Sequence, residues 1–110
     1  MNTNNAEPQR LTIRHNAFRQ QLVVVAYDIE KTEEGFKYRE VTIQPGRKTY
    51  EGIVSALVSD KYPRDRMEAI INNYLSDPSD PEILQEFNDM QAWRKEAKAI
   101  ARDILAELGE

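Results

Sequence analysis

Cysteine is absent from this chain of 110 residues, and histidine occurs once. Without cysteine, the chain cannot form disulfide bonds, use a catalytic thiolate or build zinc or iron–sulfur sites from cysteine. The one histidine, His15, follows a predicted strand and precedes Asn16, so it is interpreted as a turn residue. With no second histidine, the usual histidine spacings of metal sites are excluded as well.

Glycine-rich phosphate loops and long hydrophobic runs are also missing. None of the four glycines belongs to a GxGxxG or GxxxxGK[ST] motif. No apolar run is long enough to span a bilayer, and the first residues lack the basic and apolar segments of a signal peptide. We therefore expect a cytoplasmic protein, with a virion as the alternative location, and neither a membrane partner nor a cofactor.

The chain has more acidic than basic side chains, which disfavours binding to nucleic acid. The formal net charge is -4, and residues 1–46 are balanced, with six basic and six acidic side chains. Residues 47–110 carry nine basic and thirteen acidic side chains and so hold the whole negative excess. An acidic chain has no general affinity for nucleic acid or anionic membranes.

The first half of the chain is predicted to be rich in β-strands. Residues 1–8 are polar and end in proline, which predicts a disordered tail. Leu11 and Ile13 alternate with polar residues, which predicts a strand over 9–15. The apolar run at 22–27 includes three consecutive valines, so residues 20–30 are predicted to form a central strand contacted on both sides.

A third strand is predicted over 36–44, after a hairpin turn in which Gly35 is suited to a positive φ. The apolar positions change parity between Tyr38 and Val41, which predicts a bulge near residues 39–40. The three strands are predicted to form an antiparallel meander.

From residue 49 onward the apolar spacing becomes helical. It predicts helices over 49–61, with Thr49 as N-cap, and over 64–76, after Pro63. Gly52, in the first turn, costs about 1 kcal/mol relative to alanine and predicts a close approach of the sheet. A third helix is predicted over 80–108.

The third predicted helix is the element around which the rest is organised. Asp80 or Ser79 is its predicted N-cap, and nothing interrupts it before Gly109. Its roughly 28 residues span roughly 42 Å, and each shorter helix spans roughly 18 Å. Either the two shorter helices cover it in series, or the sheet covers part of it, or a second chain does.

A long capped helix with one apolar stripe is often an association element; the alternative is a helix lying across its own sheet and helical hairpin. We expect residues 83–90 to belong to the core of the chain and residues 93–108 to meet a partner. The predicted interaction residues are Trp93, Arg94, Ala97, Ile100, Ala101, Ile104 and Leu108.

Arg94 is the one charged residue within the stripe. Either its stem packs on the core while its guanidinium reaches water, or it contacts a carboxylate or a tyrosine.

The three carboxylates at the start of the third predicted helix do not form a calcium-binding motif. Asp77, Asp80 and Glu82 lack the spacing and central glycine of an EF-hand loop, so helix capping explains them better.

The alternative function is a small DNA-binding accessory protein. Helix 64–76 would present Arg64, Arg66, Asn72 and Asn73 to phosphates and bases, in the manner of a helix-turn-helix. Acidic residues interleave with these side chains, which argues against this function.

Several segments carry a resemblance: YEGIVSALV at 50–58, KYP at 61–63, MEAIINNYL at 67–75 and EFNDMQAWRKEAK at 86–98. Together they resemble small uncharacterised proteins encoded in gut-bacterial prophages and mobile elements, often near virion or tail genes. The resemblance covers roughly residues 20–105 and carries no catalytic residues. It implies a structural or accessory role in phage assembly.

The sequence therefore predicts a single α+β domain over residues 9–110. We expect a non-enzymatic interaction or assembly module, phage- or prophage-derived, that forms a homo-oligomer through its C-terminal helix. The partner would be a second copy or another protein of the phage or mobile element.

Overall fold

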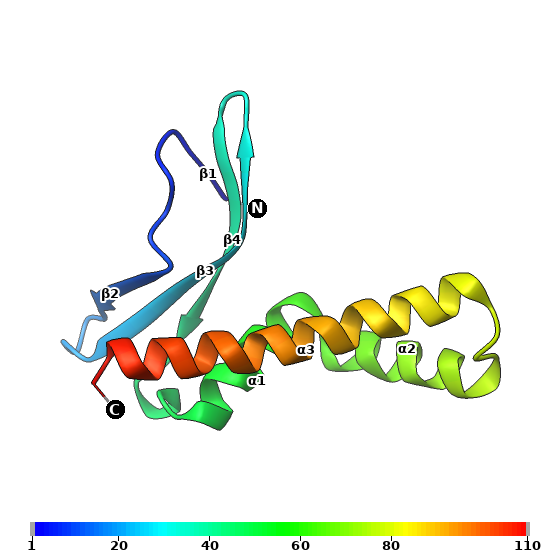
Figure 1. Cartoon of the computed structure of the whole chain (residues 1–110). Coiled ribbons are helices and arrows are strands. Elements are labelled where there is room, and N and C mark those ends of the chain that lie inside the picture. The colour runs from blue at the N-terminus through cyan, green and yellow to red at the C-terminus, as the bar shows by residue number, and fades with distance from the viewer. Residues whose placement is uncertain (1, 110) are drawn as a thin grey trace. The chain divides into compact units, whose positions relative to one another are not determined.

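A computed structural model describes residues 2–109 of the chain (Figure 1). The chain forms two compact units, Met1–Ile53 and Val54–Glu110, and each is described by itself. The first unit contains the sheet and the second most of the helices, so the α+β class is confirmed. Within the described residues, none of the helices combines the length and apolarity required to cross a bilayer.

The sheet has four antiparallel strands in the order β1-β4-β3-β2. Their bounds are Asn2–Asn4 for β1, Leu11–His15 for β2, Gln21–Thr32 for β3 and Gly35–Ile43 for β4. Strands β2, β3 and β4 form the predicted meander. The predicted number of three strands is wrong, because β1 adds a fourth.

Strand β1 lies in the segment for which a disordered tail was predicted. It pairs with β4 from Asn2 opposite Tyr38 to Asn4 opposite Phe36. The Asn2 side-chain amide also donates a hydrogen bond of 2.6 Å to Glu40 Oε1. Its three polar residues show no apolar alternation, so the sequence pattern could not reveal this strand.

Strand β3 is the centre of the sheet, as predicted. Its five residues 23–27 are each at most 5% exposed. Because successive side chains of a strand point to opposite faces, both faces of β3 are buried here. This explains why the run is continuously apolar rather than alternating.

The predicted bulge lies in the neighbouring strand. Tyr27 pairs with Arg39, but the next pair is Glu30 with Lys37, so Asp28 and Ile29 together face one residue of β4. The extra residue is therefore in β3, where Asp28 has a φ of 51°. A change of parity along one strand reveals an irregular ladder but not which strand holds the extra residue.

The helical elements agree with the predicted ranges to within a residue at each end. After a 3₁₀ turn η1, Pro45–Arg47, come α1, Tyr50–Lys61, α2, Arg64–Ser76, and α3, Pro81–Glu107. Thr49 Oγ1 accepts a hydrogen bond of 3.1 Å from the Gly52 amide, which confirms Thr49 as the cap of α1.

Gly52 makes a close approach, but not to the sheet as predicted. A Cβ atom at this position would overlap the carbonyl oxygen of Arg47 in η1. The requirement for glycine therefore arises from the tight connection between η1 and α1.

In the second unit, α2 and α3 run antiparallel and side by side (Figure 1). Tyr74 of α2 contacts Phe87 of α3. Further along α3, the Trp93 indole N–H donates a hydrogen bond of 3.1 Å to the Leu57 carbonyl of α1. The two shorter helices thus contact α3 in series, which was the first of the three predicted alternatives.

Candidate protein-interaction surface

The turn between α2 and α3 places the end of one helix beside the start of the next. Pro81 occupies the first turn of α3, and Asp80 caps it by accepting hydrogen bonds from the Glu82 and Ile83 amides at 2.9 and 3.3 Å. Asp80 is therefore the N-cap, and Ser79 instead donates a hydrogen bond to Asp77 Oδ1. Both carboxylates thus serve the turn, as the capping interpretation predicted.

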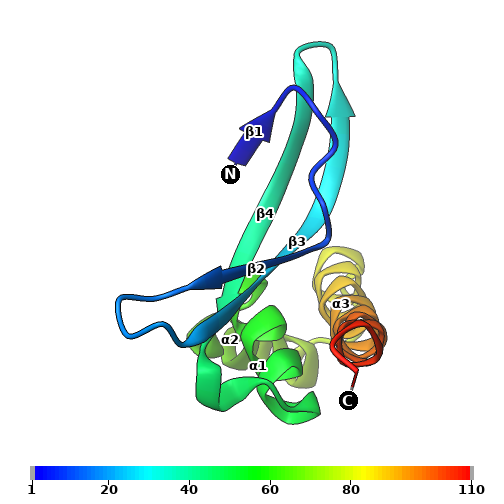
Figure 2. The ribbon, with the colours of Figure 1, turned by 90° about the vertical axis from the view of Figure 1, so that its left-hand side faces the viewer.

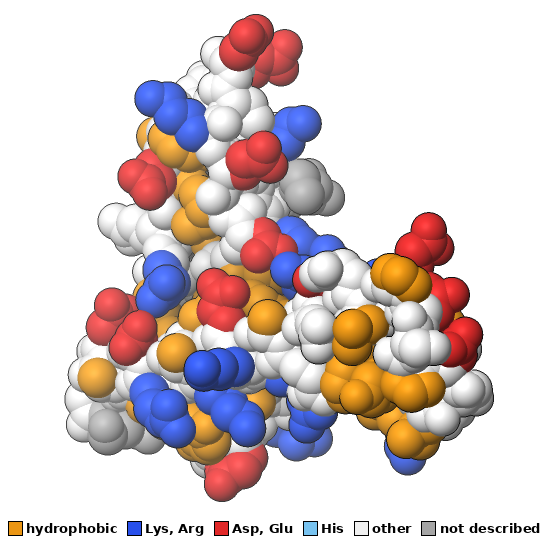
Figure 3. Space-filling view, turned by 45° about the vertical axis from the view of Figure 1, so that its right-hand side comes forward, with side chains coloured by type: hydrophobic (Ala, Val, Ile, Leu, Met, Phe, Trp, Pro, Cys, Tyr) orange, Lys and Arg blue, Asp and Glu red, His pale blue; other side chains and the backbone are white. Residues whose placement is uncertain are grey.

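Apolar side chains remain partly uncovered at this end of the hairpin. Tyr74 and Phe87 stack with ring centroids 4.0 Å apart and an interplanar angle of 9°, yet both stay half-exposed. Leu75 is 73% exposed and Leu84 is 38% exposed. Figure 3 shows hydrophobic side chains gathered over this end of the hairpin.

Helical spacing joins these residues into one surface. Ile71 and Leu75 are i, i+4 neighbours on α2, and Leu84 and Phe87 are i, i+3 neighbours on α3. The Tyr74–Phe87 contact connects the two rows. We call these five residues the hairpin patch: Ile71, Tyr74, Leu75, Leu84 and Phe87.

The predicted interaction residues lie elsewhere on α3, and most of them are buried. Five of the seven are at most 4% exposed: Trp93, Ala97, Ile100, Ala101 and Ile104. Arg94 and Leu108 are half-exposed. A side chain without exposed surface reaches a partner only if the chain opens, so an interface at these residues stays a prediction.

Trp93 is held by contacts within the helical unit. Besides the hydrogen bond from its indole N–H to Leu57, its ring lies 4.7 Å from Lys61 Nζ, a cation–π contact. A buried tryptophan needs a partner for its N–H, and here the backbone of α1 provides one. These contacts place Trp93 in the core of the unit.

Arg94 adopts the arrangement described by the first of its two interpretations. It is half-exposed, and its Nη1 donates to Gln91 Oε1 at 3.4 Å, on the same helix and at the surface. A guanidinium at the surface agrees with a long charged side chain that reaches water from an apolar stripe.

Of the four side chains proposed for DNA binding, the two arginines already have contacts within the chain. Arg64 pairs with Glu68 at 3.2 Å, and the guanidinium of Arg66 lies 5.0 Å from the centre of the Tyr62 ring. Asn72 and Asn73 are exposed. Because the carboxylate of Glu68 neutralises Arg64 locally, the arrangement weakens the case for phosphate binding.

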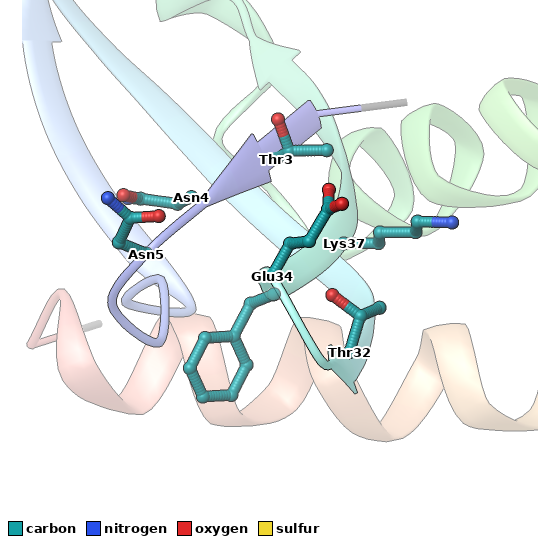
Figure 4. A pocket seen from close by; sticks show the side chains of 7 residues that line it. Thr3, Asn4, Asn5, Thr32, Glu34 and Lys37 are labelled. Carbon is teal, nitrogen blue, oxygen red and sulfur yellow. The ribbon is translucent and has the colours of Figure 1, made fainter.

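Within residues 2–109, the surface of each unit has a hollow. One, of about 440 Å³, is lined by residues of β1 and the β3–β4 hairpin, among them Thr3, Asn5, Glu34 and Lys37. In Figure 4 the side chains of Asn5 and Lys37 extend to opposite sides of the view rather than towards a common point. These two side chains therefore do not converge on one point of the hollow.

The other hollow, of about 400 Å³, lies between the start of α2 and the first half of α3. Arg66 and Tyr62 line it from one side, and Glu82, Glu86 and Asp89 from the other.

Among residues 2–109, no group of three or more histidine or acidic side chains is placed to hold a metal ion. His15 is exposed at the end of β2.

No relative guides the interpretation of these surfaces. Comparison with protein-family models, with curated proteins and with solved structures finds no match to this chain. The likeness to prophage proteins thus stays a prediction.

The sequence analysis did not predict the hairpin patch. Tyr74 and Leu75 belong to a helical apolar stripe, and such a stripe normally indicates core. The sequence signal for the patch was the pair of prolines in the turn that follows these two residues.

Proposed function

We propose that this protein is a non-enzymatic assembly module that binds a second copy of itself through the hairpin patch. The observation that carries the proposal is the exposure of Leu75, which is 73% exposed in α2 and follows the half-exposed Tyr74 in the chain. Full burial of a leucine side chain contributes about 1.5–3 kcal/mol. Association that covers this surface therefore has a substantial driving force.

The proposal keeps the C-terminal helix as the association element but moves the contact along it. Leu84 and Phe87 lie in the first half of α3, and five of the seven interaction residues predicted from 93 onward are buried. An accessory or structural role in phage or mobile-element assembly is part of the proposal. Its support is the resemblance of segments 50–75 and 86–98, together with a patch suited to repeated contacts.

Light scattering coupled to size exclusion tests the proposal over a series of concentrations. We expect the mass of the wild-type chain to rise above that of a monomer, and the double variant Leu75→Ser/Leu84→Ser to remain monomeric. Removing two exposed leucines should weaken association at least about tenfold, since 1.4 kcal/mol corresponds to that factor. Circular dichroism should show unchanged helix content, because both side chains lie at the surface.

The matched control is Ala69→Ser/Ala92→Ser, which changes two exposed positions of the same two helices outside the patch. This variant should associate like the wild type. A wild-type chain that stays monomeric at high concentration would overturn the proposal, as would unchanged association of the leucine variant.

A further inference from the structure

Charges of opposite sign are separated along this chain. Residues 67–93, which carry the hairpin patch, contain six acidic and no basic side chains. Residues 8–27 contain three arginines and no acidic side chain. The two stretches belong to different units and are complementary in charge.

The basic stretch also exposes apolar side chains. Strand β2 lies at one edge of the sheet, and the turn that follows it projects from the end of the β2–β3 hairpin (Figure 2). Ile13 on β2 is 46% exposed, and Phe18 in the turn is 84% exposed. With the exposed Arg19 of the turn they form what we call the edge surface: Ile13, Phe18 and Arg19. Arg14 is also exposed, but as the next residue of β2 it points to the face opposite to Ile13.

The turn has a defined conformation that presents Phe18 to solvent. Asn16 Oδ1 accepts hydrogen bonds from the amides of Phe18 and Gln20 at 2.9 and 3.0 Å. Arg19 has a φ of 61°, and its amide donates to the Asn16 carbonyl at 3.0 Å. Because the turn is already ordered, docking of Phe18 requires little further loss of backbone entropy.

Contact between two identical surfaces is disfavoured by their charges. Two hairpin patches would bring together two stretches with six acidic side chains each, and two edge surfaces would bring arginines against arginines. Like charges facing each other across an interface disfavour that pairing. The hairpin patch and the edge surface, by contrast, each offer apolar side chains within a stretch of one sign.

We propose that the hairpin patch of one copy binds the edge surface of a second copy, so that the chains associate head to tail. The inference rests on the self-association proposed above and specifies that the hairpin patch binds the edge surface. Each copy keeps one unused patch or edge surface after the first contact. Such a contact closes into a ring, of which two copies with reciprocal contacts are the smallest case, or continues into a chain of copies.

A mixing experiment tests this pairing. The patch variant is Leu75→Ser/Leu84→Ser, and the edge variant is Ile13→Thr/Phe18→Ser. Each variant alone should be monomeric by light scattering, because each lacks one half of the contact. Mixed, they should form a complex of one copy of each, because the patch variant retains its edge surface and the edge variant retains its patch.

A second pair of variants distinguishes loss of the contact from loss of the folded structure. The edge charge variant Arg19→Glu alters only an exposed side chain of the edge surface and should weaken wild-type association at least about tenfold. The control Lys37→Glu reverses an exposed charge on β4 of the same unit and should leave association unchanged. Because screening weakens contacts between exposed charges, the mixed complex should also dissociate as salt is added.

The outcomes distinguish the two proposals. An edge variant or an edge charge variant that associates like the wild type would overturn the head-to-tail pairing and leave self-association through the patch standing. Two well-folded monomeric variants that form no complex on mixing would also overturn it. A monomeric wild type would overturn both proposals.

Discussion

Gly52 occupies the first turn of α1, where intrinsic helix propensity alone favours alanine by about 1 kcal/mol. The backbone of Arg47 approaches so closely that no Cβ atom fits between them. Steric overlap with backbone cannot be relieved by a change of rotamer. At this position local geometry therefore outweighs propensity.

We expect Gly52→Ala to lower the free energy of unfolding by about 1–3 kcal/mol, the usual range for overpacking. Thermal or urea unfolding followed by circular dichroism measures this change. Gly46→Ala is the matched control, since a Cβ atom at Gly46 meets no atom within 4 Å. Equal stability of the two variants would show that the close approach at Gly52 is unimportant.

Leu75 and Trp93 show how differently apolar residues of helical stripes are used. Trp93 is 3% exposed, and the Leu57 carbonyl satisfies its indole N–H. Leu75 is the residue before the last one of α2. The helix ends there, so fewer neighbouring residues can cover the Leu75 side chain. The same helical periodicity therefore marks a core residue in one place and an exposed surface in the other.

At the scale of elements, α3 is defined by its two ends. Asp80 accepts hydrogen bonds from the Glu82 and Ile83 amides at the start. At the other end, Gly109 has a φ of 81°, and its amide donates to the Ala106 carbonyl at 3.2 Å. Between these ends, 27 residues at 1.5 Å each give a helix of about 40 Å. Its contacts with α1 and α2 in series follow from this length.

The cap provides a test at this scale. Asp80→Ala should lower the free energy of unfolding by about 0.5–2 kcal/mol, whereas Asp80→Asn should be nearly neutral, because asparagine also accepts from the free amides of a helix start. Asp77→Ala removes the same charge from the same turn without removing the cap, and it should have a smaller effect. Equal losses for Asp80→Ala and Asp77→Ala in thermal unfolding would contradict the assignment of the cap.

At the scale of the whole molecule, the distribution of charge matters more than its sum. The net charge of -4 arises from a balanced first part and an acidic second part, and the stretch 67–93 with the hairpin patch has six acidic and no basic side chains. This separation gives the chain one acidic and one basic apolar surface. It is the basis of the association that we propose between unlike surfaces of two copies.

The same distribution leads to a prediction for nucleic acid. In a gel shift at low salt we expect no retardation of duplex DNA, because α2 alternates basic and acidic side chains and Arg64 is paired with Glu68. Low salt is the most favourable condition for contacts with phosphates, so the absence of a shift there is informative. Retardation that disappears with added salt, and that Arg64→Ala/Arg66→Ala abolishes, would restore the DNA-binding alternative.

The sequence by itself determined the class of the fold and most of its elements. Periods of two and 3.6 residues, the caps Thr49 and Asp80, and the glycine of the β3–β4 turn are local signals. Local signals act through backbone geometry and nearby hydrogen bonds, so they can be recognised without knowledge of the rest of the chain. The three helices and the meander of β2, β3 and β4 followed from them.

Only the tertiary structure decided which apolar residues are covered. Strand β1 is polar and exists through its pairing with β4, and the extra residue of the bulge lies in β3 rather than β4. The apolar spacing of α2 includes both Ile70 and Leu75, yet Ile70 is buried while Leu75 remains exposed. Burial depends on what packs from distant parts of the chain, and periodicity along one helix does not contain that information.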